Sequence, residues 1–166
     1  YAHKAYKASK VGELILLFFG TMAMQSNVAY WAHKHRLHHR YVDTDKDPHN
    51  INQSFFHAHI GWLFKKQIKT DWNIIPDLKE NKLVVLQRQY YHRMAFGLNV
   101  AWALLLGWIF NDYWGASLIG WVTRVVFLGH STYFVNSLAH TWGAKTYSKE
   151  QTAVNNAIVA FLTFGE

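Results

Sequence analysis

The sequence predicts an all-α integral membrane protein with two transmembrane helices, at about residues 94–110 and 113–135, and a polar helical cap rich in histidine. Of its 166 residues, 51% are hydrophobic and only 16% are charged, against about 25% in typical soluble domains. Residues 94–110 contain no charged side chain, as expected of a segment inside lipid. Eleven histidines and no cysteine favour a metal site built from nitrogen ligands. The length fits a single domain over residues 1–166.

The histidines at positions 35, 38 and 39 form the centre of the predicted cap. On a helix, residues spaced i, i+3 and i+4 project from one face, so these three imidazoles converge. Neutral imidazole is a common ligand for iron, copper and zinc. The alternative is a surface helix rich in His and Arg that binds phosphates or nothing, and the spacing alone leaves both interpretations open.

The segments around this cluster each have a simple physical interpretation. Residues 11–30 begin apolar and become polar, which predicts a buried or half-buried helix that continues into the histidine cluster. Residues 40–50 predict a polar loop, because they contain three aspartates and a proline; its carboxylates suit hydrogen bonds from imidazole N–H groups. Residues 54–63 are rich in aromatic side chains, and Lys65 and Lys66 follow, as in segments that lie at a membrane surface. A pyrophosphate-bearing substrate would also suit these lysines.

The second half of the chain contains the predicted membrane hairpin. Pro76 suits a helix start, and residues 83–91 predict a short amphipathic helix that leads to the membrane. A tight turn at Asn111 and Asp112 then joins the two spans. Arg124 lies inside the second span, where a charge is costly unless it snorkels, pairs or faces the protein interior.

Beyond the second span, Asn136 and His140 share a helix face at spacing i, i+4, and residues 154–164 predict a last apolar helix. Two crossings return His140 to the side of the first histidine cluster. A further crossing by residues 11–30 would place His3 on the opposite side, so either His3 takes no part in the site or this segment does not span.

The distribution of charge predicts the orientation of the hairpin and excludes one class of partner. The turn between the spans carries no Lys or Arg, whereas both outer flanks do, so the positive-inside rule places the histidine face in the cytoplasm. The net charge of +7 permits an anionic lipid or substrate. Because no nucleic-acid motif is visible and the remainder is apolar, we expect no nucleic-acid partner.

Taken together, these stretches resemble membrane fatty-acid desaturases of the acyl-CoA Δ9 (stearoyl-CoA) type. The matching residues are 2–8, 31–40, 45–50, 59–63 and 136–140, in the order in which the family has them. The resemblance implies a fragment that lacks the start of the first histidine box and all of the third. In the family the third box follows a Phe-Gly-Glu sequence, which this chain has at residues 164–166. The fragment alone is therefore expected to be inactive.

The resemblance also implies a ligand set for a di-iron centre in the cap. The ligands would be His3 from the first box, His35, His38 and His39 from the second, and His140, with Asn136 bound through a water molecule. Residues 11–30 would line the acyl tunnel on the cytosolic side. The weaker substrate assignments that follow from the resemblance are Asn27, Trp31, Lys65 and Lys66.

The implied reaction is the O2-dependent insertion of a cis double bond, at Δ9, into a saturated acyl chain by an oxidoreductase of lipid metabolism. The substrate would be an acyl-CoA or acyl-lipid, and electrons would come from a donor such as cytochrome b5 or a ferredoxin. Two alternatives stay open: a related di-iron lipid hydroxylase, and a non-catalytic metal-binding membrane protein. The sequence does not choose the acyl carrier, the chain length or the oligomeric state.

Overall fold

The structure is a computed structural model that describes residues 1–5, 7–146 and 150–163. These residues form helices joined by loops, with one isolated β-bridge between Ala144 and Asn155. The chain divides into two compact units, residues 1–33 with 70–128 and residues 34–69 with 129–166. Tyr6 and the Phe-Gly-Glu sequence at 164–166 lie outside the described residues.

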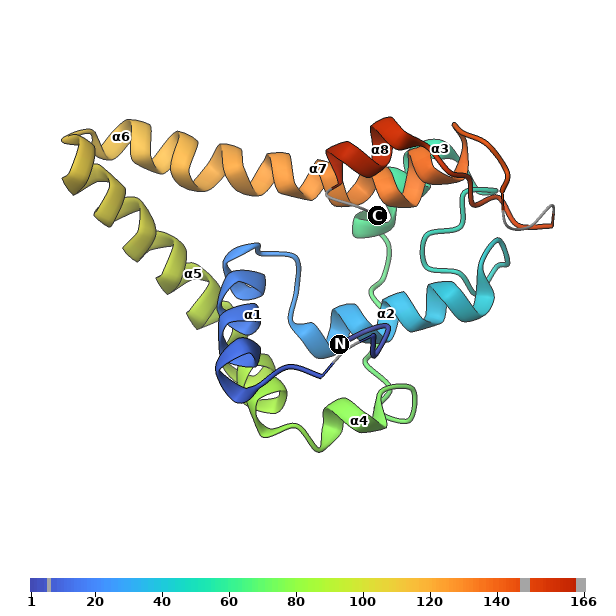
Figure 1. Ribbon diagram of the computed structural model, residues 1–166, viewed down its shortest axis with the longest axis horizontal. Coiled ribbons are helices and arrows are strands. Elements are labelled where there is room, and N and C mark those ends of the chain that lie inside the picture. Colours follow the sequence, from blue (N-terminus) through green and yellow to red (C-terminus); the bar gives the residue numbers. More distant parts are fainter. Residues whose placement is uncertain (6, 147–149, 164–166) are drawn as a thin grey trace. The chain divides into compact units, whose positions relative to one another are not determined.

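A helical hairpin is the main feature of the first unit. Helix α5 (Lys82–Phe110) leads to a turn, and the chain returns through α6 (Tyr113–Gly115), the π-helical η2 (Ala116–Thr123) and the start of α7 (Arg124–Ser137) (Figure 1). The predicted turn is confirmed.

The residue types at this turn explain why the chain reverses there. Asn111 ends α5 in the left-handed conformation at φ 51°, which asparagine tolerates better than most residues. The side chain of Asp112 accepts a hydrogen bond from the Gly115 amide at 2.8 Å and so caps the returning helix. Gly107 permits the close return, because a Cβ there would lie 2.3 Å from the ring of Tyr113.

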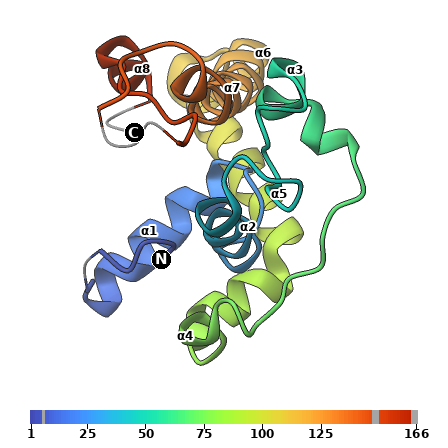
Figure 2. The same cartoon turned by 90° about the vertical axis from the view of Figure 1, so that its right-hand side faces the viewer.

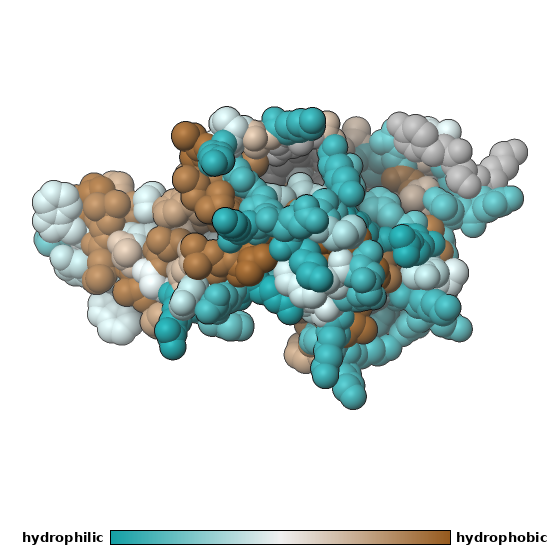
Figure 3. Space-filling view, turned by 90° about the horizontal axis from the view of Figure 1, so that it is seen from below, coloured by the Kyte–Doolittle hydropathy of each residue, from teal (hydrophilic) through white to brown (hydrophobic). Residues whose placement is uncertain are grey.

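Both arms of the hairpin are long and apolar enough to cross a bilayer. The two candidate spans are Lys82–Phe110 and Tyr113–His140, and most of each apolar window is exposed, as a lipid-facing surface would be. Large apolar side chains that are at least 70% exposed lie at the end of the hairpin, at Trp108, Phe110, Trp114 and Ile119. Figure 3 shows this end on the left, with hydrophobic side chains and pale aromatic rings.

The predicted division between the amphipathic segment and the first span was wrong. The amphipathic segment 83–91 and the span 94–110 are one continuous helix of 29 residues, about 44 Å long. Asn81 caps its start by accepting hydrogen bonds from the amides of Leu83 and Val84. Since a bilayer core is about 30 Å thick, part of this helix would extend beyond the core.

The predicted single helix over residues 11–30 was also wrong, because the chain breaks into α1 (Lys10–Met22) and α2 (Val28–Tyr41). The polar residues between them satisfy the exposed helix ends. Asn27 accepts a hydrogen bond from the Tyr30 amide at 2.9 Å, and the amide of Ser26 donates to the hydroxyl of Tyr91. With 13 residues, α1 is about 20 Å long and too short to span a bilayer.

The guanidinium of Arg124 faces the protein interior, where it has hydrogen-bond acceptors. Its guanidinium donates to the carbonyl oxygens of Gly120 at 3.0 Å and Met22 at 3.2 Å, and to the side-chain oxygen of Asn99. Asn99 is fully buried and in turn donates to Met22 and Ala95. Because Met22 is the last residue of α1, the cation lies at the negative end of that helix dipole.

The core of the first unit lies where α1, α4 (Pro76–Lys79) and the start of α5 meet the beginning of α2. As predicted, Pro76 occupies the first turn of a helix. The buried apolar side chains of this core are Leu17, Ala29, Ala32, Ile75, Leu78 and Val84.

The second unit contains the rest of α2, a polar loop, α3 (Phe55–His59), η1 (Gly61–Phe64), the end of α7, η3 (Leu138–His140) and α8 (Ala157–Leu162). Figures 1 and 2 both show α3 beside α7. The loop at 40–50 was predicted correctly. The last apolar helix is shorter than the predicted 154–164, because Asn156 caps it and fixes its start at Ala157.

Candidate metal centre

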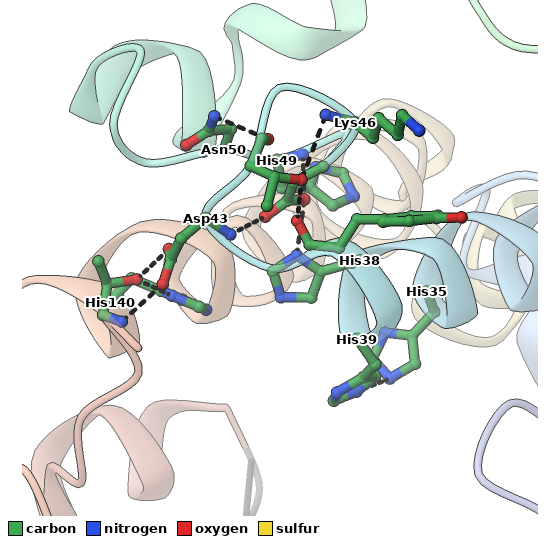
Figure 4. A network of polar contacts seen from close by, with 12 residues as sticks. His35, His38, His39, Asp43, Lys46, His49, Asn50 and His140 are labelled. Carbon is green, nitrogen blue, oxygen red and sulfur yellow. Dashed lines mark hydrogen bonds and ion pairs between the residues drawn. The ribbon is translucent and has the colours of Figure 1, made fainter. Parts of the chain in front are cut away.

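Helix α2 presents the histidines of the HxxHH pattern inside the second unit. The Nε2 atoms of His35 and His39, one helical turn apart, lie 3.0 Å from each other, and Figure 4 shows the two side chains close together. Because an imidazole nitrogen binds a metal at about 2.1 Å, both nitrogens can reach one ion. The predicted convergence of three imidazoles is confirmed for these two, whereas the ring centroid of His38 lies 5.6 Å from that of His39.

His38 is held by a buried carboxylate. Its Nδ1 lies 2.8 Å from Oδ1 of Asp47, and the side chain of His38 is 11% exposed while that of Asp47 is 1% exposed. The same carboxylate accepts hydrogen bonds from the backbone amides of His49 at 2.8 Å and Asp43 at 3.1 Å. Asn50 ties the loop further by donating to the carbonyl of Thr44. The loop is therefore fixed around Asp47 and orients one imidazole.

His140 reaches the same region from η3, which directly follows α7. Its ring centroid lies 5.3 Å from that of His38, although the two residues are distant in sequence. Its Nδ1 is 2.7 Å from the hydroxyl oxygen of Thr152. Of the predicted ligands, the second unit thus brings together His35, His38, His39 and His140.

The donor set fits iron. Imidazole suits iron, copper, nickel and zinc alike, so the fit permits iron without selecting it. In the loop, Asp47 accepts hydrogen bonds from imidazole and amide groups, and Asp43 accepts one from a hydroxyl group. Such carboxylate contacts orient metal-binding histidines in proteins.

The roles of the other predicted site residues stay predictions. His3 belongs to the first unit, and Asn136 lies in α7 four residues before His140. Asn27 has a structural task as the cap of α2. The other predicted substrate-binding side chains are exposed: Trp31 on α2, and Lys65 and Lys66 after η1. The ammonium group of Lys65 donates a hydrogen bond to the side chain of Gln53 at 2.5 Å.

Sequence reasoning missed a buried lysine next to the cluster. Lys34 is 6% exposed, and its Nζ lies 3.6 Å from the ring centroid of Trp62. Burial lowers the pKa of Lys34 to about 7. Burial also lowers the pKa of His49, with further contributions from the charges of Lys34 and His38. A lysine between two histidines gives no sequence signal that its side chain turns inward.

A second imidazole pair was also missed. His59 of α3 lies 3.0 Å from His130 through Nε2 and Nδ1, and 3.0 Å from the hydroxyl of Ser137 through its own Nδ1. Burial, and next the charge of His130, lower the pKa of His59. Neither histidine matched a ligand position, so no sequence pattern placed them together. They connect α3 to α7.

The two membrane-length helices and the imidazole cluster define a class, that of helical membrane proteins with a histidine-rich polar unit. The family model for fatty acid desaturases matches residues 1–166. The chain is 36% identical to the "Probable acyl-CoA desaturase" of Schizosaccharomyces pombe over 169 residues, covering 100% of this chain and 35% of that protein. It belongs to the fatty acid desaturase family.

Two insect relatives show the breadth of the likeness. The chain is 35% identical to the "Acyl-CoA Delta-12 desaturase" of Tribolium castaneum and 34% identical to the "Acyl-CoA Delta-9 desaturase" of Acheta domesticus, covering 100% of this chain in both. The matches cover 49% and 48% of those proteins. The chain therefore spans about a third to a half of the length of these relatives.

Proposed function

We propose that the full-length protein containing this chain is an acyl-CoA desaturase that inserts a cis double bond, at Δ9, into a saturated acyl chain. The observation that carries this proposal is a group of four imidazoles in one unit of a chain of this family: the Nε2 atoms of His35 and His39 lie 3.0 Å apart, and the ring centroid of His38 lies 5.6 Å from that of His39 and 5.3 Å from that of His140. The full ligand set would add His3, and Asn136 through a water molecule. The site would lie at the cytoplasmic face of the membrane.

The reaction requires a metal because an alkane C–H bond is far too weak an acid for a side-chain base. Two irons, when bound, would supply the oxidising power that activates O2. Overall, one O2, two electrons from a cytochrome b5 or ferredoxin-like donor and two protons combine with the two substrate hydrogens to give two waters and the alkene. Two other residues contact the proposed ligands: Asp47 orients His38, and Thr152 contacts His140.

Substrate binding would use apolar and basic surfaces. An apolar cavity of about 430 Å³ in the first unit is lined by α1 and α5, including Leu14, Leu17 and Phe18. Each acyl methylene that it buried would contribute about 0.8 kcal/mol. Lys65 and Lys66 would contact the phosphates of the CoA headgroup, since exposed lysines attract anionic groups.

The test is expression of the full-length protein in cells that lack their own desaturase, followed by analysis of the fatty acids. We expect a Δ9-unsaturated product, and we expect His38→Ala to lose it. His92→Ala is the control and should leave the product unchanged, because His92 is exposed and distant from the cluster in sequence. A hydroxylated product would support the hydroxylase alternative. Purified protein that holds zinc and gives no product would support the non-catalytic alternative, and either result would overturn the proposal.

A further inference from the structure

The hydroxyl group of Thr152 lies between a carboxylate and a predicted metal ligand. Its oxygen is 2.5 Å from Oδ1 of Asp43 and 2.7 Å from Nδ1 of His140, while the Thr152 amide lies 2.7 Å from Oδ2 of Asp43. Three segments of the second unit therefore meet at one hydroxyl: the polar loop, η3 and the chain before α8. Figure 4 shows Asp43 and His140 joined by these contacts.

Counting hydrogens fixes the direction of each bond. A hydroxyl has one hydrogen to donate, and an aspartate carboxylate only accepts. The hydroxyl hydrogen of Thr152 must therefore point to Asp43, and its oxygen must accept a hydrogen from Nδ1 of His140. That assignment places the proton of the neutral imidazole on Nδ1 and leaves the lone pair on Nε2.

His38 reaches the same tautomer by a shorter route, because Asp47 accepts directly from its Nδ1 at 2.8 Å. The two aspartates are themselves linked, since the backbone amide of Asp43 donates to Oδ2 of Asp47 at 3.1 Å. One loop thus sets two imidazoles from different elements, the first directly and the second through a threonine. Both rings keep Nε2 as the available metal-binding atom.

We infer that Thr152 is a positioning residue that, together with Asp43, sets the tautomer and ring orientation of His140 for metal binding. This inference rests on the proposed function, in which His140 is a ligand. Removing a hydrogen-bond partner of a metal-binding histidine typically weakens metal affinity 10–100-fold. Thr152→Val keeps the shape of the side chain and removes the acceptor, whereas Thr152→Ser keeps the hydroxyl.

The experiment measures metal binding as well as activity. The full-length protein is purified in detergent, freed of metal, and titrated anaerobically with Fe²⁺, with circular dichroism recorded on each variant. We expect Thr152→Val to bind Fe²⁺ about 10–100-fold more weakly than wild type, and Thr152→Ser to regain wild-type affinity. Thr163→Val is the matched control, because its hydroxyl donates to backbone carbonyl oxygens of α8.

The outcomes separate this inference from the proposed function. Wild-type affinity in Thr152→Val would overturn the inference and leave the proposed function intact. A wild-type protein that binds no iron and gives no unsaturated product would overturn the proposed function, and the inference with it. If Thr152→Val fails to fold, Thr152→Ala removes the hydroxyl without adding a methyl group, and the same loss of affinity is expected.

Discussion

Replacing Asp47 by alanine removes the acceptor on which the polar loop and His38 both depend. Asp47 is 4% exposed and accepts three hydrogen bonds, from His38 at 2.8 Å and from the amides of His49 at 2.8 Å and Asp43 at 3.1 Å. A hydrogen bond to a charged group contributes about 1.5–3 kcal/mol. Because bonds that share a partner are not additive, we expect Asp47→Ala to lower the free energy of unfolding by about 3–5 kcal/mol.

The assay is denaturant unfolding of the full-length protein in detergent, together with its iron content. Metal affinity should fall 10–100-fold as well, since His38 loses the group that orients it. Asp45→Ala is the matched control: Asp45 lies two residues away in the same loop and is exposed, so we expect a change within about 0.5 kcal/mol. If Asp47→Ala unfolds and binds iron as wild type does, the carboxylate neither holds the loop nor orients the imidazole.

Two further predictions concern other parts of the chain. The lowered pKa of His59 means that the unfolded chain takes up a proton more readily than the folded one. The free energy of unfolding should therefore be highest above about pH 6.5 and fall as the pH drops below it. Unfolding curves between pH 5 and 8 check this. The prediction is contradicted if the free energy of unfolding of a His59→Gln variant falls as steeply with pH as that of wild type. In α5, Gly107→Ala would place a methyl group against the ring of Tyr113 and should cost about 1–3 kcal/mol. Gly97→Ala, with nothing within 4 Å, should gain up to about 1 kcal/mol, and equal melting temperatures for the two variants would refute the packing argument.

The hairpin could be predicted because its signals are local. An uncharged apolar run, an Asn-Asp turn and a second apolar run each act through neighbouring residues. The break between α1 and α2 could not be predicted in this way. Its polar groups are satisfied by residues far along the chain: Gln87 accepts from the Val28 amide, and Tyr91 accepts from Ser26. Without these partners, a helix through residues 23–27 satisfies the backbone equally well.

The site shows the same division between local and distant determinants. The convergence of His35 and His39 follows from helix geometry alone. The polar loop was expected to supply acceptors for imidazole, and Asp47 does so. Thr152 gave no sequence signal, because its partner Asp43 is more than a hundred positions away. Lys34 likewise depends on Trp62, which belongs to a different helix.

The position of the loop carboxylates has a consequence for the charge of the proposed centre. Imidazole ligands are neutral, so a ligand set made only of histidine leaves the positive charge of bound metal without compensation from the ligands themselves. Asp47 contacts His38 through one direct hydrogen bond. Asp43 is connected to His140 through two hydrogen bonds, with the hydroxyl of Thr152 between them. Negative charge placed there attracts the metal and raises the basicity of each imidazole, yet leaves the ligand positions to nitrogen. In the proposed di-iron centre, the carboxylates of Asp43 and Asp47 would therefore do the electrostatic work that ligand carboxylates perform in di-iron helix bundles.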